Sequence, residues 1–134
     1  MRVFIDTNVV LDLLQEREPF IENAERLFER IDAGEIEGFI AATTITNIFY
    51  IVRRASGLAI AYDAIAQILT DLTICPVDRD VLEQSLALNL SDFEDAVQYA
   101  CALAYGVDFI VTRDTKGFAN ATIPVILPEA LSFD

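Results

Sequence analysis

Four aspartates are spaced along this chain so that they could meet in one carboxylate site. Asp6 directly follows an apolar run, Asp92 and Asp95 are three residues apart, and Asp114 follows another apolar run. Residues i and i+3 share one side of a helix, so Asp92 and Asp95 can point together. Converging carboxylates repel one another and their pKa values rise, a penalty that a divalent cation removes. The four acids are therefore a candidate site for a divalent cation such as Mg²⁺ and for metal-assisted attack of water on a phosphate ester.

Each of these acids also has an ordinary structural explanation. Asp6 could cap a helix that follows the first strand. Asp92 and Asp95 would stabilise any helix N-terminus through the helix dipole. Asp114 could be a turn residue. No single acid is specific, and the interpretation rests on their joint order along the chain.

Composition narrows the chemistry further. The 134 residues contain no histidine, which excludes Ser-His-Asp triads, Cys-His pairs and histidine general bases. Cys75 and Cys101 lack CxxC spacing, stand among apolar neighbours and are expected to be small buried residues. Any hydrolytic site must therefore use carboxylates, most plausibly with a metal ion that prefers oxygen ligands.

The net charge of −13, from 22 acidic and 9 basic residues, disfavours a broad basic face for a polyanion. A smaller positive rim is conceivable from four bases: Arg53 and Arg54, seven or fewer residues after Asn47, and Arg113 and Lys116, which flank Asp114. Such a rim would make few phosphate contacts. Alternatively, Arg53 and Arg54 are surface residues that form ordinary ion pairs.

The elements that must position these residues follow from apolar patterning. Short apolar runs predict strands near residues 3–5, 38–42, 72–77, 108–112 and 123–127. Helical spacing predicts helices near residues 9–15, 20–31, 45–52, 61–72, 80–88 and 91–105, with a short turn from Pro128. Thr43 or Thr44 could cap the third helix, and Ser91 with Glu94 fits a capping box that opens the last long one.

Apolar, non-alternating strands separated by helices predict an α/β fold, a three-layer α/β/α sandwich around a mostly parallel sheet. One domain, residues 1–134, accounts for the length. In such sheets, sites form at the carboxyl ends of strands, where the acids would gather. No apolar run approaches the ~20 residues of a membrane span, and Asp6 comes too early for a signal peptide, so we expect a cytoplasmic protein.

Three stretches resemble the motifs of PIN domains. Residues 5–12 are similar to the opening motif, residues 92–96 to the third, and residues 111–114 with Phe118 to the fourth. The resemblance covers essentially the whole chain. It implies Mg²⁺- or Mn²⁺-dependent cleavage of RNA, often as the VapC-like toxin of a toxin–antitoxin pair. An antitoxin and a second copy of the chain are the implied protein partners.

The resemblance also implies roles for individual residues. Asp6 and Asp95 would coordinate the metal directly, and Asp92 and Asp114 would complete or orient the ligand set. Thr7 would orient Asp6 or contact water, and Asn8 would steady the loop, unless both residues serve only as a turn and cap. Asp12 shares a helix face with Asn8 and would either support the site or be solvated; solvation is preferred.

Two positions depart from the family pattern. The second motif usually supplies a Glu where this chain has Asn47, which would instead position a water at the metal. The acid that usually precedes the Phe of the fourth motif is replaced by Gly117. A site lacking two charges would hold metal less tightly, so a weakened PIN-like scaffold or protein-binding module is the alternative function. A phosphatase with an aspartyl nucleophile is disfavoured, because Asn8 stands where such enzymes place a second Asp.

Overall fold

The central sheet has five parallel strands. The computed structural model describes residues 1–118 and 121–131. The strands are β1 (Arg2–Ile5), β2 (Glu37–Ala41), β3 (Thr73–Cys75), β4 (Phe109–Val111) and β5 (Val125–Ile126). Their order in the sheet is β3-β2-β1-β4-β5, and every pairing is parallel. The predicted parallel α/β sheet is therefore confirmed.

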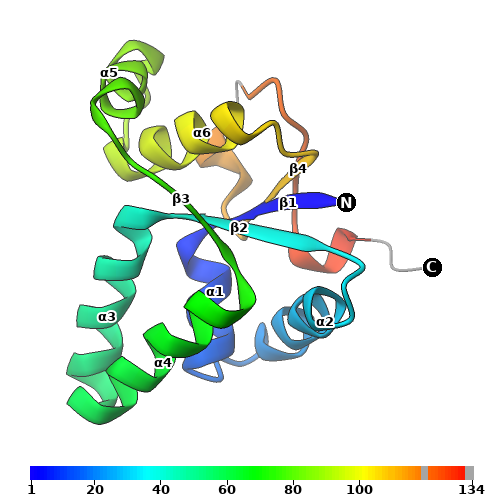
Figure 1. The fold of residues 1–134 in the computed structure, drawn as a ribbon. Helices are drawn as coiled ribbons and strands as arrows, with labels where there is room; N and C mark the ends of the chain where they lie inside the picture. The colour runs from blue at the N-terminus through cyan, green and yellow to red at the C-terminus, as the bar shows by residue number, and fades with distance from the viewer. Residues whose placement is uncertain (119–120, 132–134) are drawn as a thin grey trace.

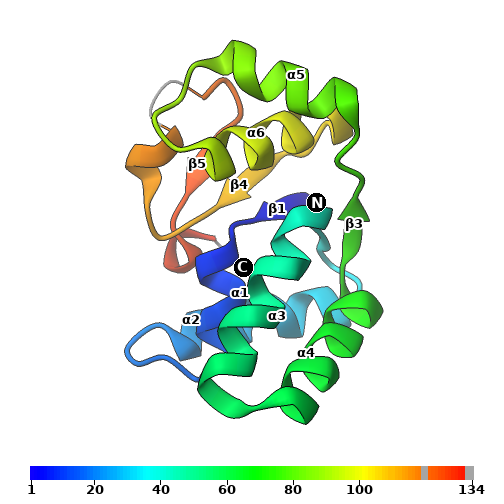
Figure 2. The same ribbon diagram turned by 90° about the vertical axis from the view of Figure 1, so that its left-hand side faces the viewer.

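Helices cover both faces of this sheet, as Figure 1 and Figure 2 show from two directions. One face carries α1 (Thr7–Leu14), α2 (Ile21–Asp32), α3 (Ala42–Ser56) and α4 (Leu58–Asp71). The other face carries α5 (Arg79–Leu88) and α6 (Phe93–Tyr105). Two short 3₁₀ turns, η1 (Thr115–Phe118) and η2 (Pro128–Ala130), follow β4 and β5. The three-layer α/β/α sandwich is confirmed.

Alternation of side chains along β1 builds the two halves of the core. Val3 and Ile5 join the apolar cluster beneath α1 to α4, whereas Phe4 joins the cluster beneath α6. All three side chains are fully buried, which explains why the strand is apolar from Val3 to Ile5, whereas Arg2 at its start is exposed. Cys75 and Cys101 are free and buried in the second cluster, as their neighbours predict.

The register of the two central strands fixes where the site lies. Ile5 of β1 stands opposite Val111 of β4, and the backbone N–H of Asp6 donates to the carbonyl of Val111 at 3.0 Å. The residues that directly follow the two strands, Asp6 and Thr112, therefore emerge together at the carboxyl edge of the sheet.

Two of the predicted caps are wrong. The N-cap of α6 is Asp92, whose Oδ1 accepts from the backbone N–H of Asp95 at 3.0 Å, and Ser91 lies outside the helix. The chain reaches extended backbone one residue later than the capping-box pattern implies. Helix α3 begins earlier than predicted, directly after β2, with Ala41 as its N-cap and no side-chain cap. Thr44 is thereby moved into the first turn, where its hydroxyl faces α1.

Among residues 1–118 and 121–131, no helix combines the length and the apolar character that a membrane crossing requires.

Candidate metal centre

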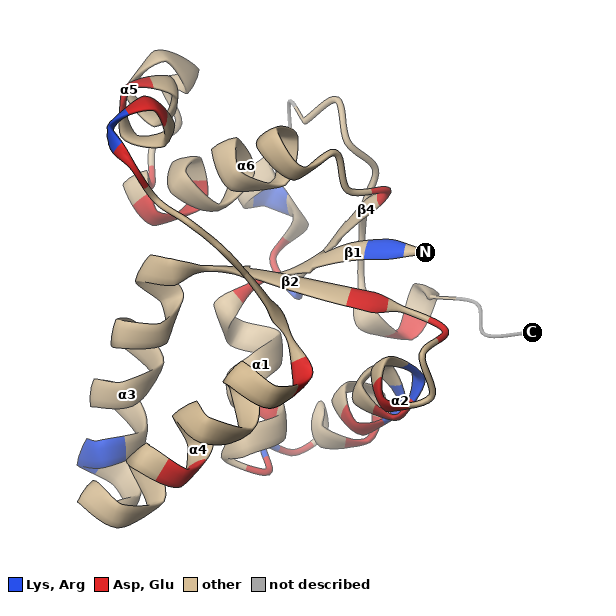
Figure 3. Cartoon of the chain, in the orientation of Figure 1, with Lys and Arg blue, Asp and Glu red and all other residues tan. Residues whose placement is uncertain are grey.

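An acidic pocket of about 270 Å³ lies at the carboxyl edge of the sheet. Its walls come from the end of β1, the start of α1, the start of α6 and the segment after β4. The lining residues are Asp6, Thr7, Asn8, Leu11, Asp92, Glu94, Asp95 and Asp114. Five of these eight residues are acids and none is a lysine or arginine. Figure 3 shows acidic residues at the start of α6, above the start of α1. The structure thus brings the four predicted aspartates together and adds Glu94.

Asp6 is the most buried acid of the pocket, with 6% of its surface exposed. Its Oδ1 accepts from Gln98 Nε2 at 2.9 Å, and its Oδ2 accepts from Thr112 Oγ1 at 2.6 Å. Asp6 occupies the N-cap position of α1, but its side chain makes no capping bond. Capping therefore does not explain this residue. Its carboxylate is held by two neutral donors, which fix its orientation without neutralising its charge.

Gln98 and Thr112, the two hydrogen-bond partners of the Asp6 side chain, were not predicted from the sequence. Gln98 follows Asp95 by three residues and so shares its side of α6, a spacing that could have identified it. Its side chain is 1% exposed, and its Oε1 is a buried oxygen without a hydrogen-bond partner among the described residues. Thr112 follows β4 as Asp6 follows β1, and it also accepts from the backbone N–H of Asp114 at 3.0 Å.

Asp95 is the acid of the pocket whose pKa is raised. Partial burial, followed by the charges of Asp6, Asp92, Glu94 and Asp114, raises the pKa of its carboxyl group to about 6. Its carboxylate lies against η1: a Cβ atom added at Gly117 would stand 2.6 Å from Asp95 Oδ2. The absence of a side chain at position 117 therefore makes room for Asp95. Gly117 therefore replaces the acid that is usual in the family, and the carboxylate of Asp95 lies beside it.

Asp92 and Asp114 line the pocket from more exposed positions. Each also performs the local task that its sequence context suggests. Asp92 caps α6, and Asp114 Oδ1 accepts from the backbone N–H of Lys116 at 3.2 Å, which tightens the start of η1. Each carboxylate retains an oxygen that these contacts do not use, and could therefore also face a cation.

Thr7 contacts Glu94 and Thr44 instead of Asp6. Its hydroxyl donates to Glu94 Oε1 at 2.9 Å and lies 3.4 Å from Thr44 Oγ1. Thr44 is fully buried, so this contact ties the first turn of α3 to the pocket. Asn8 accepts, through Oδ1, from the backbone N–H of Arg113 at 3.5 Å, which joins the start of α1 to the segment after β4.

Three predicted site residues on α3 lie away from the pocket. Asn47 is exposed and is not among the lining residues. Arg53 and Arg54 occupy the last turn of α3, nine and ten residues beyond Thr44, or about 14–15 Å along the helix axis. Figure 3 shows these bases at the end of α3 far from α6. The structure does not assemble the predicted rim around the acids, because none of its four bases is among the residues that line the pocket.

Asp12 is buried, so the prediction that it is solvated is wrong. Its side chain is 1% exposed and accepts from Arg113 twice, at 2.6 Å from Nε and 3.1 Å from Nη2. Arg113 also lies over the ring of Phe20, 3.9 Å from its centroid. The predicted RNA-binding guanidinium is therefore committed to an internal ion pair. The periodicity of α1 could not show this, because the partners are 101 residues apart.

The pocket fits a hard divalent cation in its donor chemistry. All of its acids offer carboxylate oxygens, and no histidine or cysteine competes for a softer ion. Burial is the largest cause of the raised pKa of Asp95, and the charges of the four neighbouring acids add to it, so the pocket disfavours a further negative charge. In the present arrangement, no three acids or cysteines among the described residues are close enough together to ligate one ion. The hydrogen bonds of Asp6, Glu94 and Asp92 hold their carboxylates apart from one another around the pocket.

The family model of the PIN domain matches residues 2–116, which is most of the chain. The chain belongs to the PIN domain family. This PIN domain is 26% identical over 133 residues to ribonuclease VapC1 of Aquifex aeolicus strain VF5, covering 96% of this chain and 91% of that protein. The predicted membership of the PIN domain family is therefore confirmed.

Solved structures show the same fold. The PIN domain superposes on Mycobacterium tuberculosis VapC20, a toxin that cleaves the sarcin–ricin loop, with a TM-score of 0.73 and 20% identity. That match covers 89% of this chain and 95% of VapC20. A toxin–antitoxin complex from Klebsiella pneumoniae gives a TM-score of 0.72 at 23% identity, covering 94% and 97% of the two chains.

Proposed function

We propose that this PIN domain is a divalent-metal-dependent endoribonuclease and the toxin of a toxin–antitoxin pair. The observation that carries the proposal is the acidic pocket: five carboxylates converge on it, and Asp6 is held only by neutral donors. The relatives support the substrate class, because the Aquifex protein is named a ribonuclease and VapC20 is described as a toxin that cleaves the sarcin–ricin loop.

In this proposal Asp6 and Asp95 hold the cation, and Glu94, Asp92 and Asp114 supply further oxygens. When bound, Mg²⁺ or Mn²⁺ would activate water and offset the charge of the phosphodiester. Gln98 and Thr112 hold both oxygens of Asp6 in place, which preserves the geometry of the carboxylate between turnovers. The acidic walls require the cation before a phosphate can approach, because five carboxylates would otherwise repel it.

The alternative, a weakened PIN-like module, rested on two missing charges. Glu94 lines the pocket and brings its acids to five, so the count of carboxylates does not favour this alternative. The deciding issue is whether these acids bind metal and cleave RNA.

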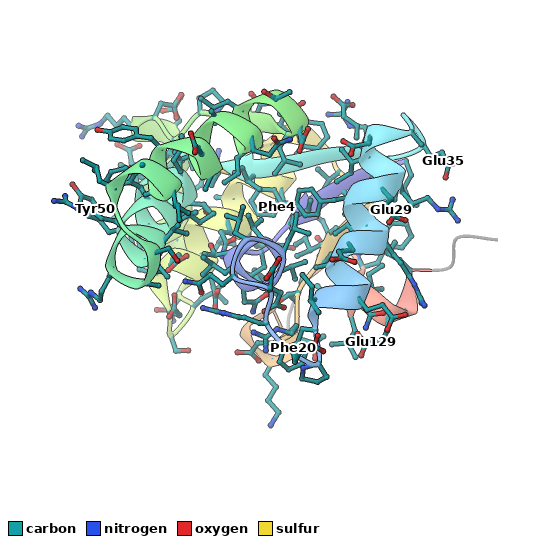
Figure 4. The ribbon with its side chains drawn as sticks, turned by 90° about the horizontal axis from the view of Figure 1, so that it is seen from below. Phe4, Phe20, Glu29, Glu35, Tyr50 and Glu129 are labelled. Atoms are coloured by element: carbon teal, nitrogen blue, oxygen red, sulfur yellow. The ribbon has the colours of Figure 1, made fainter. Side chains whose placement is uncertain are left out.

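A protein partner is supported by the apolar surface of α3 and α4. Tyr50 and Tyr62 are 57% and 61% exposed and line a groove of about 250 Å³ with Phe49, Ile45, Ile65 and Thr46. Figure 4 shows Tyr50 at the periphery, far from Phe4 at the centre. Exposed apolar surface of this kind marks interaction sites. An antitoxin segment or a second copy of the chain is the proposed occupant.

The test is cleavage of a mixed pool of structured and single-stranded RNA with Mg²⁺ or Mn²⁺, comparing wild type with Asp6→Asn. We expect metal-dependent cuts that disappear in the variant while the circular dichroism spectrum is unchanged. If wild type neither cleaves nor binds metal, the nuclease is contradicted and the weakened module takes its place.

A further inference from the structure

Asp12 and Arg113 form an ion pair between α1 and the segment after β4, two parts of the chain that also supply residues to the acidic pocket. Asp12, on α1, is 1% exposed, and the side chain of Arg113 is 27% exposed. Two hydrogen bonds, at 2.6 and 3.1 Å, join the guanidinium to both carboxylate oxygens. A bidentate pair of this kind fixes orientation as well as distance.

The neighbours of Arg113 in sequence both reach the pocket. Thr112, one residue earlier, donates to Asp6 Oδ2 at 2.6 Å, and Asp114, one residue later, lines the pocket. Asp12 stands six residues after Asp6 on the helix that begins at the pocket. The ion pair therefore ties the segment after β4 to the same helix that begins at Asp6.

Several other contacts hold the pair in place. Phe20 covers the guanidinium at 3.9 Å, and Arg17 Nη1 lies 3.9 Å from Asp12 Oδ1. Figure 4 shows Phe20 at the edge of the molecule, beside Glu129. The backbone N–H of Arg113 also donates to Asn8 Oδ1 at 3.5 Å. These contacts use the guanidinium and the backbone of Arg113 within the protein.

We infer that Asp12 and Arg113 are positioning residues, which set Thr112 and Asp114 against Asp6, and that Arg113 is not an RNA contact. The inference rests on the proposed function, since it concerns the geometry of the same pocket. The two roles of Arg113 predict opposite effects of Asp12→Asn. An RNA-contacting Arg113 would be released and bind RNA more tightly. A positioning pair would be broken, and the pocket would lose its geometry.

The experiment compares Asp12→Asn, Arg113→Lys, Arg113→Gln and the double variant Asp12→Asn/Arg113→Gln. Arg79→Gln and Glu83→Gln are matched controls, because they remove the same charges from an exposed ion pair on α5. Cleavage gives kcat and KM. RNA affinity is measured in an Asp6→Asn background, and Mn²⁺ affinity is measured by calorimetry without RNA.

We expect Asp12→Asn and Arg113→Lys each to lower kcat by about 10- to 100-fold, because small misplacements of reacting groups cost that much. The RNA dissociation constant should stay within about twofold of each matched control, and the double variant should be no worse than the poorer single variant. Arg113→Lys keeps the charge but loses the two-pronged contact, so it separates positioning from simple attraction of phosphate.

Tighter RNA binding by Asp12→Asn with unchanged kcat would overturn the inference and restore Arg113 as an RNA contact. If wild type binds Mn²⁺ without cleaving RNA, the proposed function fails but the inference is still decided. Equal weakening of Mn²⁺ binding in Asp12→Asn and Arg113→Lys would support it, and unchanged binding would overturn it. If wild type neither cleaves RNA nor binds Mn²⁺, both proposals are overturned.

Discussion

Asp6 and Asp12 are two buried carboxylates, six residues apart in one segment, that the fold treats in opposite ways. Asp12, 1% exposed, receives a bidentate arginine and a second arginine nearby. Asp6, 6% exposed, receives an amide and a hydroxyl. Both carboxylates have hydrogen bonds to both oxygens. Their difference lies in charge: one is neutralised by the protein and the other is not.

This difference in charge distinguishes a carboxylate that stabilises the fold from one that is available to bind a cation. Burying a charge without a counter-charge is costly, so a structural carboxylate is normally paired, as Asp12 is. Among the described residues, Asp6 has no cationic partner, and it faces four other acids across the pocket. Such an arrangement is unfavourable for the protein alone and favourable for binding a cation. The comparison therefore identifies the functional acid of the pair.

Substituting Asp6 should have the largest effect on activity. We expect Asp6→Asn to lower RNA cleavage by about 1,000-fold or more, since a direct metal ligand and its charge are lost. The isosteric amide should keep the fold, which circular dichroism checks. Cleavage within tenfold of wild type would remove Asp6 from the mechanism and end the comparison.

The stabilities of the two sites should respond in opposite directions. Arg113→Gln leaves Asp12 buried without its bidentate partner and should lower the free energy of unfolding by about 2–4 kcal/mol, somewhat less than for a fully isolated pair because Arg17 remains. Asp6→Asn should leave this free energy unchanged or raise it, because it removes mutual repulsion. Urea denaturation in EDTA measures both variants, and equal destabilisation would contradict the distinction.

The raised pKa of Asp95 gives a second test of the cost of gathering acids in the pocket. Because the pKa in the folded state is about 6, above its ordinary value of 3.8, this group stabilises the fold below pH 4 and loses that contribution as pH rises through 6. Metal-free Asp95→Asn should therefore gain about 1–2 kcal/mol over wild type between pH 4 and pH 7.5, after allowance for partial exposure. Urea denaturation at the two pH values tests this; a constant difference would show that the pKa of Asp95 is not raised in the folded protein.

Gly117 should be intolerant of even a methyl group. In Gly117→Ala the new Cβ would lie 2.6 Å from Asp95 Oδ2, so the carboxylate must move. We expect cleavage to fall about tenfold, the effect of about 1.4 kcal/mol in transition-state energy. Gly117→Asp restores the acid usual in the family and should nevertheless lower activity. Thr115→Ala, in the same turn, is the control, and higher activity of Gly117→Asp would refute this account of Gly117.

Asn47 should matter least. It is exposed and outside the pocket lining, so Asn47→Ala is expected to change kcat by less than about twofold, as for ordinary surface substitutions. A tenfold loss would show that α3 moves toward the pocket when metal or RNA binds.

The parts predictable from sequence are those set by local pattern. Apolar runs located all five strands, and the positions of Asp6 directly after β1 and of Asp114 three residues after β4 placed these acids at one edge of the sheet. The i, i+3 spacing of Asp92 and Asp95 predicted that both acids lie on one side of the start of α6, and both line the pocket. Long-range partners could not be obtained in this way. Asp12 and Arg113 meet across 101 residues because β1 and β4 are neighbours, a fact of topology that neither segment contains.

The sequence also could not show which side chains of α3 face the pocket, because this depends on the residue at which the helix begins. Asn47 and Thr44 are one turn apart on α3, and the family pattern pointed to Asn47. The start of α3 directly after β2 instead brings Thr44 to Thr7 and leaves Asn47 exposed. A shift of two or three residues in a predicted helix start changes which side chain faces a site.

The most direct test of this account is calorimetric titration of Mn²⁺ into wild type, Asp6→Asn and Glu83→Gln, without RNA. We predict that wild type and Glu83→Gln bind the ion equally and that Asp6→Asn binds it at least about tenfold more weakly, a difference of 1.4 kcal/mol or more. Equal binding by wild type and Asp6→Asn, or none by wild type, would contradict the claim that the charge of Asp6 is kept for a metal ion.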